Sequence, residues 1–127
     1  MNTAQDITKI HSTIAKEHDE YRGILSGSLE GQESEKYLSL TDKIDRVAFH
    51  VIEEIIELRR TYPHKYWKKT KEEINRDEML EETADVFLMT RAMIMAVCKA
   101  NNISELDFLN IVLEKIRKNK ERIKNGY

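Results

Sequence analysis

Residues 80–100 read LEETADVFLMTRAMIMAVCKA, and this stretch decides which fold the chain can adopt. Projected as a helix, it carries apolar residues on nearly every side, and a helix of that kind is buried from several directions. The stretch therefore predicts the central helix of an all-α bundle, covered by partner helices and by a second subunit. Asp85 and Arg91 are the charges within it that need an explanation.

A second helical pattern runs from Glu35 to about Arg60, where Pro63 stops it. Glu54 falls on the edge of its apolar stripe, and Glu57 lies just beyond on the same side. Surface helices usually place glutamates opposite the apolar face, so this border position is unusual. The stripe itself consists of Ile44, Val47, Ala48, Val51, Ile55 and Leu58.

Further helices are predicted on both sides of this pair. Thr3 can cap a helix that reaches about Leu25, and Ser104 can cap another that ends at Gly126. Thr70 and Glu73 have the spacing of a capping box, with a break near Asn75. We expect a four- to five-helix bundle in one domain spanning residues 1–127. Because its central helix would otherwise expose apolar surface, we expect oligomerisation to complete it, as a homodimer or a dimer of dimers.

The composition limits the function classes. The chain has 40% hydrophobic and 35% charged residues with a single proline, which is typical of a soluble helical protein. A net charge of -2 argues against a nucleic-acid binder. Cys98 is the only cysteine, so no disulfide can form within the chain, and residues 92–98, the longest apolar run, are too short to span a membrane. We expect a cytoplasmic protein without a membrane partner.

Two pairs of carboxylates, each three residues apart, are the candidate site. Glu54 with Glu57, and Glu82 with Asp85, project from neighbouring positions on their helices. If these helices pack together, four carboxylates converge, and an oxygen-only cluster suits Mg²⁺. Glu53 is a candidate base for an attacking water, or a group behind the ligands. The alternative is a set of ordinary solvated glutamates.

Two more groups could contact a substrate. Lys115, Asn119 and Arg122 share one border of the last helix's apolar face, where phosphates could bind. A solvated, basic helix end is the alternative. Trp67 could stack on a base, or it could serve the core or a lid. The chain has no Glu-x-x-His, no glycine-rich phosphate loop and no Cys/His zinc spacing, which argues against di-iron, P-loop and zinc chemistry.

The acidic motifs resemble the signature of the all-α nucleoside triphosphate pyrophosphatases, which include the MazG-like enzymes and the dimeric dUTPases. That signature is EExxE on one helix and ExxD on the next. Here residues 53–57 read EEIIE and residues 82–85 read ETAD. The resemblance implies a MazG-like helical fold and Mg²⁺ as cofactor. It also implies hydrolysis of a nucleoside triphosphate to the monophosphate and pyrophosphate. The ligands would be Glu54, Glu57, Glu82 and Asp85, and the catalytic candidates are Glu53, Glu54 and Glu57.

The end of the chain is similar to the dimeric dUTPase pattern KNxxNxxRQxxGY, since residues 115–127 read KIRKNKERIKNGY. Ile116 and Ile123 stand where that family has Asn and Gln. The resemblance implies dUTP as the favoured substrate in nucleotide-pool house-cleaning. A broad-specificity dNTP pyrophosphohydrolase and a non-enzymatic helical interaction module stay open as alternatives. The implied phosphate-binding residues are Lys115, Asn119, Arg122 and Tyr127.

Overall fold

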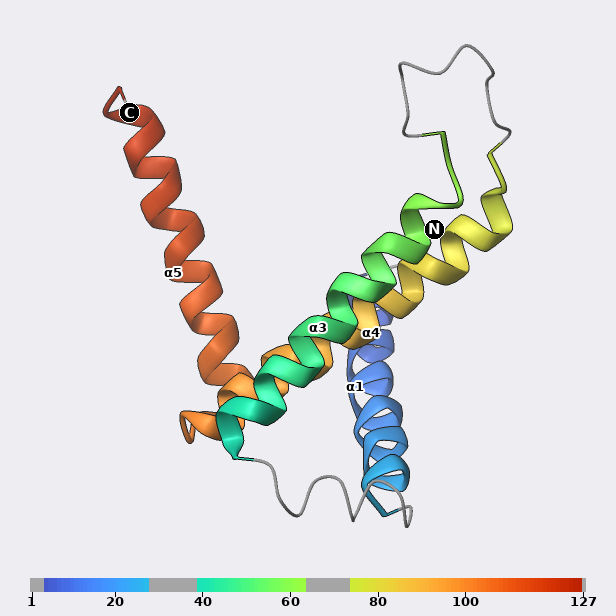
Figure 1. Cartoon of the computed structure of the whole chain (residues 1–127). Coiled ribbons are helices and arrows are strands. Elements are labelled where there is room, and N and C mark those ends of the chain that lie inside the picture. Colours follow the sequence, from blue (N-terminus) through green and yellow to red (C-terminus); the bar gives the residue numbers. More distant parts are fainter. Residues whose placement is uncertain (1–3, 28–38, 64–73, 127) are drawn as a thin grey trace. The chain divides into compact units, whose positions relative to one another are not determined.

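The computed structural model describes residues 4–27, 39–63 and 74–126, and each regular element in these ranges is an α-helix. The prediction of an all-α protein is confirmed. Among these residues no helix is long and apolar enough to cross a membrane. The helices are α1 (Ala4–Gly27), α3 (Leu40–Arg59), α4 (Arg76–Ala100) and α5 (Glu105–Lys124), as labelled in Figure 1.

Contacts within the chain divide it into two units, Met1–Ser39 and Leu40–Tyr127. The first unit contains α1. Asp6 lies in its first turn, where the interaction of an acidic side chain with the helix dipole is favourable. Ile7, Ile10, Ile14 and Tyr21 recur at helical spacing along α1, and of these Ile14 is half-buried. The exposed members are Ile7, Ile10 and Tyr21.

In the second unit α3 and α4 form an antiparallel pair (Figure 1). Val51 on α3 and Ala92 and Cys98 on α4 are the buried apolar residues of this pair. The amide of Asn75 donates to the carbonyl of Thr61 at 3.2 Å. This bond ties the end of α3 to the start of α4 on the two sides of residues 64–73. It thereby helps to fix the register of the two helices.

Both ends of α4 are capped by asparagines. The Asn75 side chain accepts from the amide of Glu78 at 3.1 Å and donates to its carboxylate at 3.1 Å. The predicted break near Asn75 is thus the N-cap of α4, which begins at Arg76. At the other end, Asn102 adopts a left-handed φ of 55°. The amide of Ile103 then reaches back to the carbonyl of Cys98 at 3.0 Å, which closes the helix.

The turn between α4 and α5 also contains an ion pair. Arg91 of α4 and Glu105 of α5 meet at 2.8 Å, and the Arg91 side chain is only 12% exposed. The charge of Arg91 within an apolar segment is thereby explained. Ser104 caps α5 as predicted, in a capping box with Asp107. We call residues 101–105, with the Arg91–Glu105 pair, the elbow.

The apolar face predicted on α5 is present but not buried, because α5 contacts the α3–α4 pair little and chiefly at the elbow. No side chain of α5 is buried. The expectation that residues 80–100 are covered on all sides is likewise met only in part: Leu80 is 69% and Phe87 is 49% exposed. The predicted helix start at Glu35 and the Thr70–Glu73 box lie outside the described residues.

Candidate metal centre

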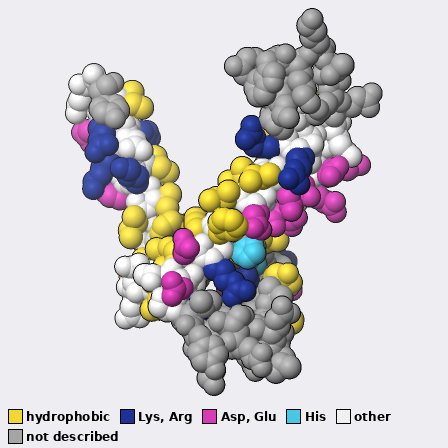
Figure 2. All heavy atoms as spheres, viewed as in Figure 1, with side chains coloured by type: hydrophobic (Ala, Val, Ile, Leu, Met, Phe, Trp, Pro, Cys, Tyr) yellow, Lys and Arg dark blue, Asp and Glu magenta, His cyan; other side chains and the backbone are white. Residues whose placement is uncertain are grey.

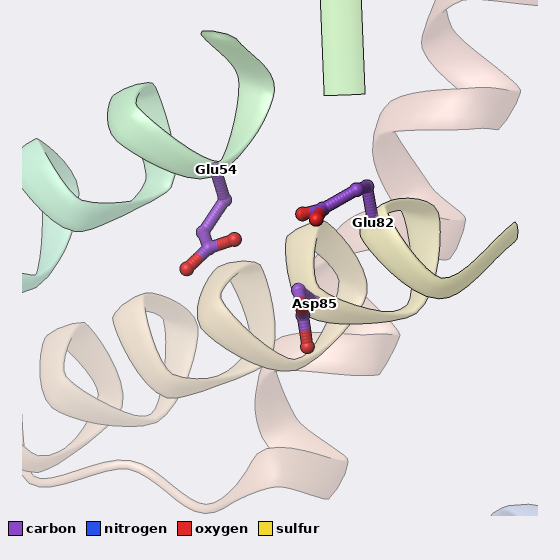
Figure 3. A group of neighbouring side chains, drawn as sticks. All are labelled: Glu54, Glu82 and Asp85. Carbon is purple, nitrogen blue, oxygen red and sulfur yellow. The ribbon is translucent and has the colours of Figure 1, made fainter. Parts of the chain in front are cut away.

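Three carboxylates from two helices come together where α3 and α4 pair. Glu54 extends from α3 toward α4, which contributes Glu82 and Asp85 (Figure 3). Each offers one carboxylate oxygen, and these oxygens lie within 4.8 Å of one another. That spacing lets one cation contact all three oxygens at the distances usual for carboxylate ligands.

The local sequence explains the arrangement. Glu82 and Asp85 are three residues apart on α4, so their side chains leave the helix on the same side. Glu54 lies three residues after the buried Val51, at the border of the α3 face that packs on α4. Because α3 and α4 are antiparallel and in contact, this border meets the first half of α4.

One oxygen of each glutamate is shielded from water without a hydrogen-bond partner. Within the described residues these are Oε2 of Glu54 and Oε2 of Glu82. Both residues are half-buried as a whole, so the shielding concerns particular atoms. An inaccessible carboxylate oxygen without a partner costs free energy, which a bound cation would offset. The donor set therefore fits a divalent metal ion.

The charges around the cluster raise the pKa of both glutamates. The pKa of Glu54 lies above 4.5 because burial of its carboxylate disfavours the anion, and because Glu57, Asp85 and Glu53 add negative charge. The pKa of Glu82 is raised in the same way, first by burial and then by Glu57 and Asp85. Among the described residues, the neighbouring charges that raise the pKa of Glu54 and Glu82 all belong to carboxylates. The cluster thus has an excess of negative charge.

Glu57 and Glu53 stand beside the three clustered carboxylates. Glu57 is exposed, and its carboxylate is close enough to raise the pKa of both Glu54 and Glu82. It lies outside the set whose oxygens share the 4.8 Å limit. Glu53 is exposed and lies 3.4 Å from Nδ1 of His50. Of the four predicted ligands, the structure therefore brings three together and places the fourth at their edge.

The predicted phosphate-binding residues lie apart from this cluster. Lys115, Asn119 and Arg122 are exposed on α5. Lys115 follows Glu105 by ten residues, or about 15 Å along the helix axis. Neither Lys115 nor Arg122 is among the charges that shift the pKa of Glu54 or Glu82. Trp67 and Tyr127 lie outside the described residues.

Comparison with protein-family models, with curated proteins and with solved structures finds no match for this chain. A function therefore has to be inferred from the chain's own residues. The sequence pattern did not predict the pairing of His50 with Glu53, which lies next to Glu54 in the chain. Their spacing of three residues on one helix was the signal that could have revealed it.

The raised pKa values predict how the stability of the metal-free protein depends on pH. Between 4.5 and the raised pKa, folded Glu54 and Glu82 hold protons that the unfolded chain has released. The free energy of unfolding therefore falls as pH rises through this window. Asp107 acts at lower pH, because its hydrogen bonds with Ser104 lower its pKa below 3.8, and its contribution disappears only in more acidic solution.

Thermal unfolding in EDTA between pH 4 and pH 8 measures this effect. We expect the Tm of the wild type to fall with rising pH relative to a Glu54→Gln/Glu82→Gln double variant. Added Mg²⁺ should reduce the difference. If Tm depended on pH in the same way for both proteins in EDTA, these two glutamates would not be the cause of the pH dependence.

Proposed function

We propose that this chain is a Mg²⁺-dependent nucleoside triphosphate pyrophosphohydrolase that converts a deoxynucleoside triphosphate, with dUTP favoured, to the monophosphate and pyrophosphate. The observation that supports it most is the meeting of Glu54, Glu82 and Asp85, with one shielded and unpartnered oxygen on each glutamate. Two consecutive helices, α3 and α4, supply these groups, as the pyrophosphatase resemblance implies for its EExxE and ExxD motifs.

The choice of Mg²⁺ follows from the donor atoms. Carboxylate oxygens are hard ligands, and in the part of the chain that the structure describes no cysteine or histidine, which would favour zinc or copper, belongs to the cluster. Glu54, Glu82 and Asp85 would hold the ion. Glu57, at the edge of the carboxylate cluster, would be a further ligand. A bound Mg²⁺ would neutralise substrate phosphates and activate water for attack.

The remaining chemistry is assigned to the chain's own side chains. Glu57 is exposed beside two of the ligands, so it can accept a proton from the attacking water or orient it. Glu53 is the second candidate for this role, held by His50. Lys115, Asn119, Arg122 and Tyr127 would bind the triphosphate tail. Trp67 would cover the base. The preference for dUTP rests on the resemblance of residues 115–127 to the dimeric dUTPase pattern.

A panel of dNTPs and NTPs tests the proposal directly. With Mg²⁺ present we expect release of pyrophosphate and a nucleoside monophosphate, fastest from dUTP, and no release in EDTA. Comparable rates for several dNTPs would favour the broad-specificity alternative. Release of phosphate and a diphosphate would contradict the cleavage position.

A non-enzymatic helical interaction module is the second candidate, favoured by the many exposed apolar side chains on α3 and α5. If the chain is such a module, it should hydrolyse no triphosphate, and its Tm should not change when Mg²⁺ is added. The two candidates therefore differ in both measurements.

A further inference from the structure

Helix α5 is held to the rest of its unit mainly at one end. It contacts the α3–α4 pair little and chiefly at the elbow, and none of its side chains is buried. Packing along the length of α5 therefore contributes little to fixing its direction. That direction depends on the interactions of the elbow.

The backbone hydrogen bonds of the elbow end one helix and begin the next, but they do not fix the angle between them. The bond from the amide of Ile103 to the carbonyl of Cys98, at 3.0 Å, belongs to the last turn of α4. The capping box of Ser104 with Asp107 belongs to the first turn of α5. Rotation about the backbone bonds between Ile103 and Ser104 would break neither, and it would pivot α5 about the end of α4.

The Arg91–Glu105 ion pair crosses from one helix to the other. Nη2 of Arg91 lies 2.8 Å from Oε2 of Glu105, which is in the first turn of α5. Arg91 precedes Cys98 by seven residues, so it lies on the same side of α4, about 10 Å closer to the start of that helix. The ion pair and the Ile103–Cys98 bond thus anchor the start of α5 at two points along α4. Two separated anchors define a direction, whereas one permits a pivot.

Partial burial distinguishes this ion pair from an ordinary surface pair. The side chain of Arg91 is 12% exposed and that of Glu105 is 35% exposed. Fully exposed pairs contribute little because water screens them, whereas a charge shielded from water is costly when its partner is removed. Loss of the Glu105 charge would therefore drive the Arg91 guanidinium toward water, and the second anchor would be lost.

The length of α5 turns a small change at the elbow into a large displacement at the far end. Arg122 follows Glu105 by 17 residues, or about 26 Å along the helix axis. A tilt of about 10° at the elbow would move Arg122 by about 4 to 5 Å, which is more than the length of a hydrogen bond. Figure 2 shows basic side chains gathered toward this end of α5. Their positions are therefore the most sensitive to the elbow.

We propose that the Arg91–Glu105 ion pair fixes the direction of α5 relative to α4, and that Arg91 is thereby a positioning residue for the basic residues at the far end of α5. The first step stands on the geometry of the elbow alone. The second step rests on the proposed function, in which Lys115 and Arg122 bind the triphosphate. Arg91 would act on the substrate only through the placement of these two residues.

Double electron–electron resonance between two spin labels measures the direction of α5. Labels at Asp77→Cys on α4 and Lys120→Cys on α5 replace exposed residues, whereas the native Cys98 is buried and should not react. Dilution with unlabelled protein limits the measurement to distances within one chain. Arg91→Met removes the charge and keeps an unbranched side chain suited to an apolar segment. Lys99→Met, at an exposed residue of the same helix, is the matched control.

We expect a narrow distance distribution for the wild type and for Lys99→Met. Arg91→Met should broaden the distribution or shift its maximum by about 4 Å or more, and Glu105→Gln should do the same from the more exposed partner. The exchange Arg91→Glu/Glu105→Arg restores an ion pair of reversed sign and should recover the narrow distribution. The proposal is overturned if both single variants keep the wild-type distribution, or if the exchange does not recover it.

Steady-state kinetics test the positioning role. We expect Arg91→Met to raise the KM for the triphosphate about tenfold and to leave kcat within about threefold, because the groups displaced bind the substrate and do not hold the metal. A purely stabilising role would lower the fraction of folded enzyme, and hence kcat, at unchanged KM. An unchanged KM would therefore overturn the positioning role. A wild type that hydrolyses no triphosphate would overturn the proposed function, while the distances would still decide the role of the ion pair.

Discussion

Replacing Glu82 by glutamine is expected to lower Mg²⁺-dependent release of pyrophosphate by about 100-fold or more. Mutation of a residue that only hydrogen-bonds to a metal ligand already lowers metal affinity or activity about tenfold to 100-fold, and Glu82 is itself a proposed ligand. Glutamine keeps the shape of the side chain but removes the charge that the cation requires. It also relieves repulsion from Glu57 and Asp85, which raise the pKa of Glu82. The metal-free variant should therefore be as stable as the wild type or more stable.

Glu81→Gln is the matched control for this experiment. Glu81 is the preceding residue on α4, is exposed, and is not one of the clustered carboxylates. The same chemical change there should leave the rate within about twofold, because exposed charges outside the site contribute little. Steady-state rates with both variants at saturating Mg²⁺ measure the difference. Equal rates for Glu82→Gln and the wild type would remove Glu82 from the site.

Replacing Ala92 by asparagine should have the largest effect on stability among the substitutions considered. Ala92 is 6% exposed on α4, so the larger side chain has no space and its amide has no assured partner. Overpacking and a buried, unsatisfied amide together cost about 2–4 kcal/mol. For a unit of this size the Tm should fall by roughly 10–20 °C.

Ala84→Asn separates this packing effect from helix propensity. Ala84 lies on the same helix and is exposed, so the change from alanine to asparagine carries only the propensity cost of about 0.6 kcal/mol. Thermal and urea unfolding of both variants at one protein concentration measure the difference. Similar unfolding free energies would show that the side of α4 carrying Ala92 is not packed as described.

Much of the helical architecture could be predicted from the sequence because its signals are local. Ser104 with Asp107 and Asn75 with Glu78 form caps that depend on residues three apart, and both are present. The turn at Asn101 and Asn102 follows from the left-handed conformation that asparagine tolerates. Such features need no knowledge of the tertiary structure.

The burial of the helices could not be predicted in the same way. An apolar stripe shows that a face can be covered, but it does not identify the partner. The stripe of α3 that contains Val51 packs on α4, whereas the apolar face of α5 stays exposed. A second group of exposed apolar residues on α3, which is Phe49, Ile52 and Ile56, lies outside the longer stripe and was not predicted. Pairing of this kind is a tertiary property.

The candidate site was predictable in its ligand types and only partly in its geometry. The spacing of Glu82 and Asp85 placed them together on one helix, and Glu54 joins them because α3 and α4 pack antiparallel. The helical projection placed Glu54 on the edge of the apolar stripe and Glu57 just beyond it, and the motif assigned both as ligands. In the structure Glu54 borders the packed face and Glu57 is exposed. The difference arises from the angle between successive side chains on a helix.

The most direct test of the metal centre is a titration with Mn²⁺, a spectroscopic substitute for Mg²⁺, followed by electron paramagnetic resonance. Mn²⁺ that is bound to the protein loses the sharp signal of the free ion. The wild type and Glu81→Gln should reduce that signal equally, and added Mg²⁺ should restore it. Glu82→Gln should bind at least about tenfold more weakly. If the wild type leaves the signal unchanged, or if Glu82→Gln binds as tightly as the wild type, Glu54, Glu82 and Asp85 do not form a metal site.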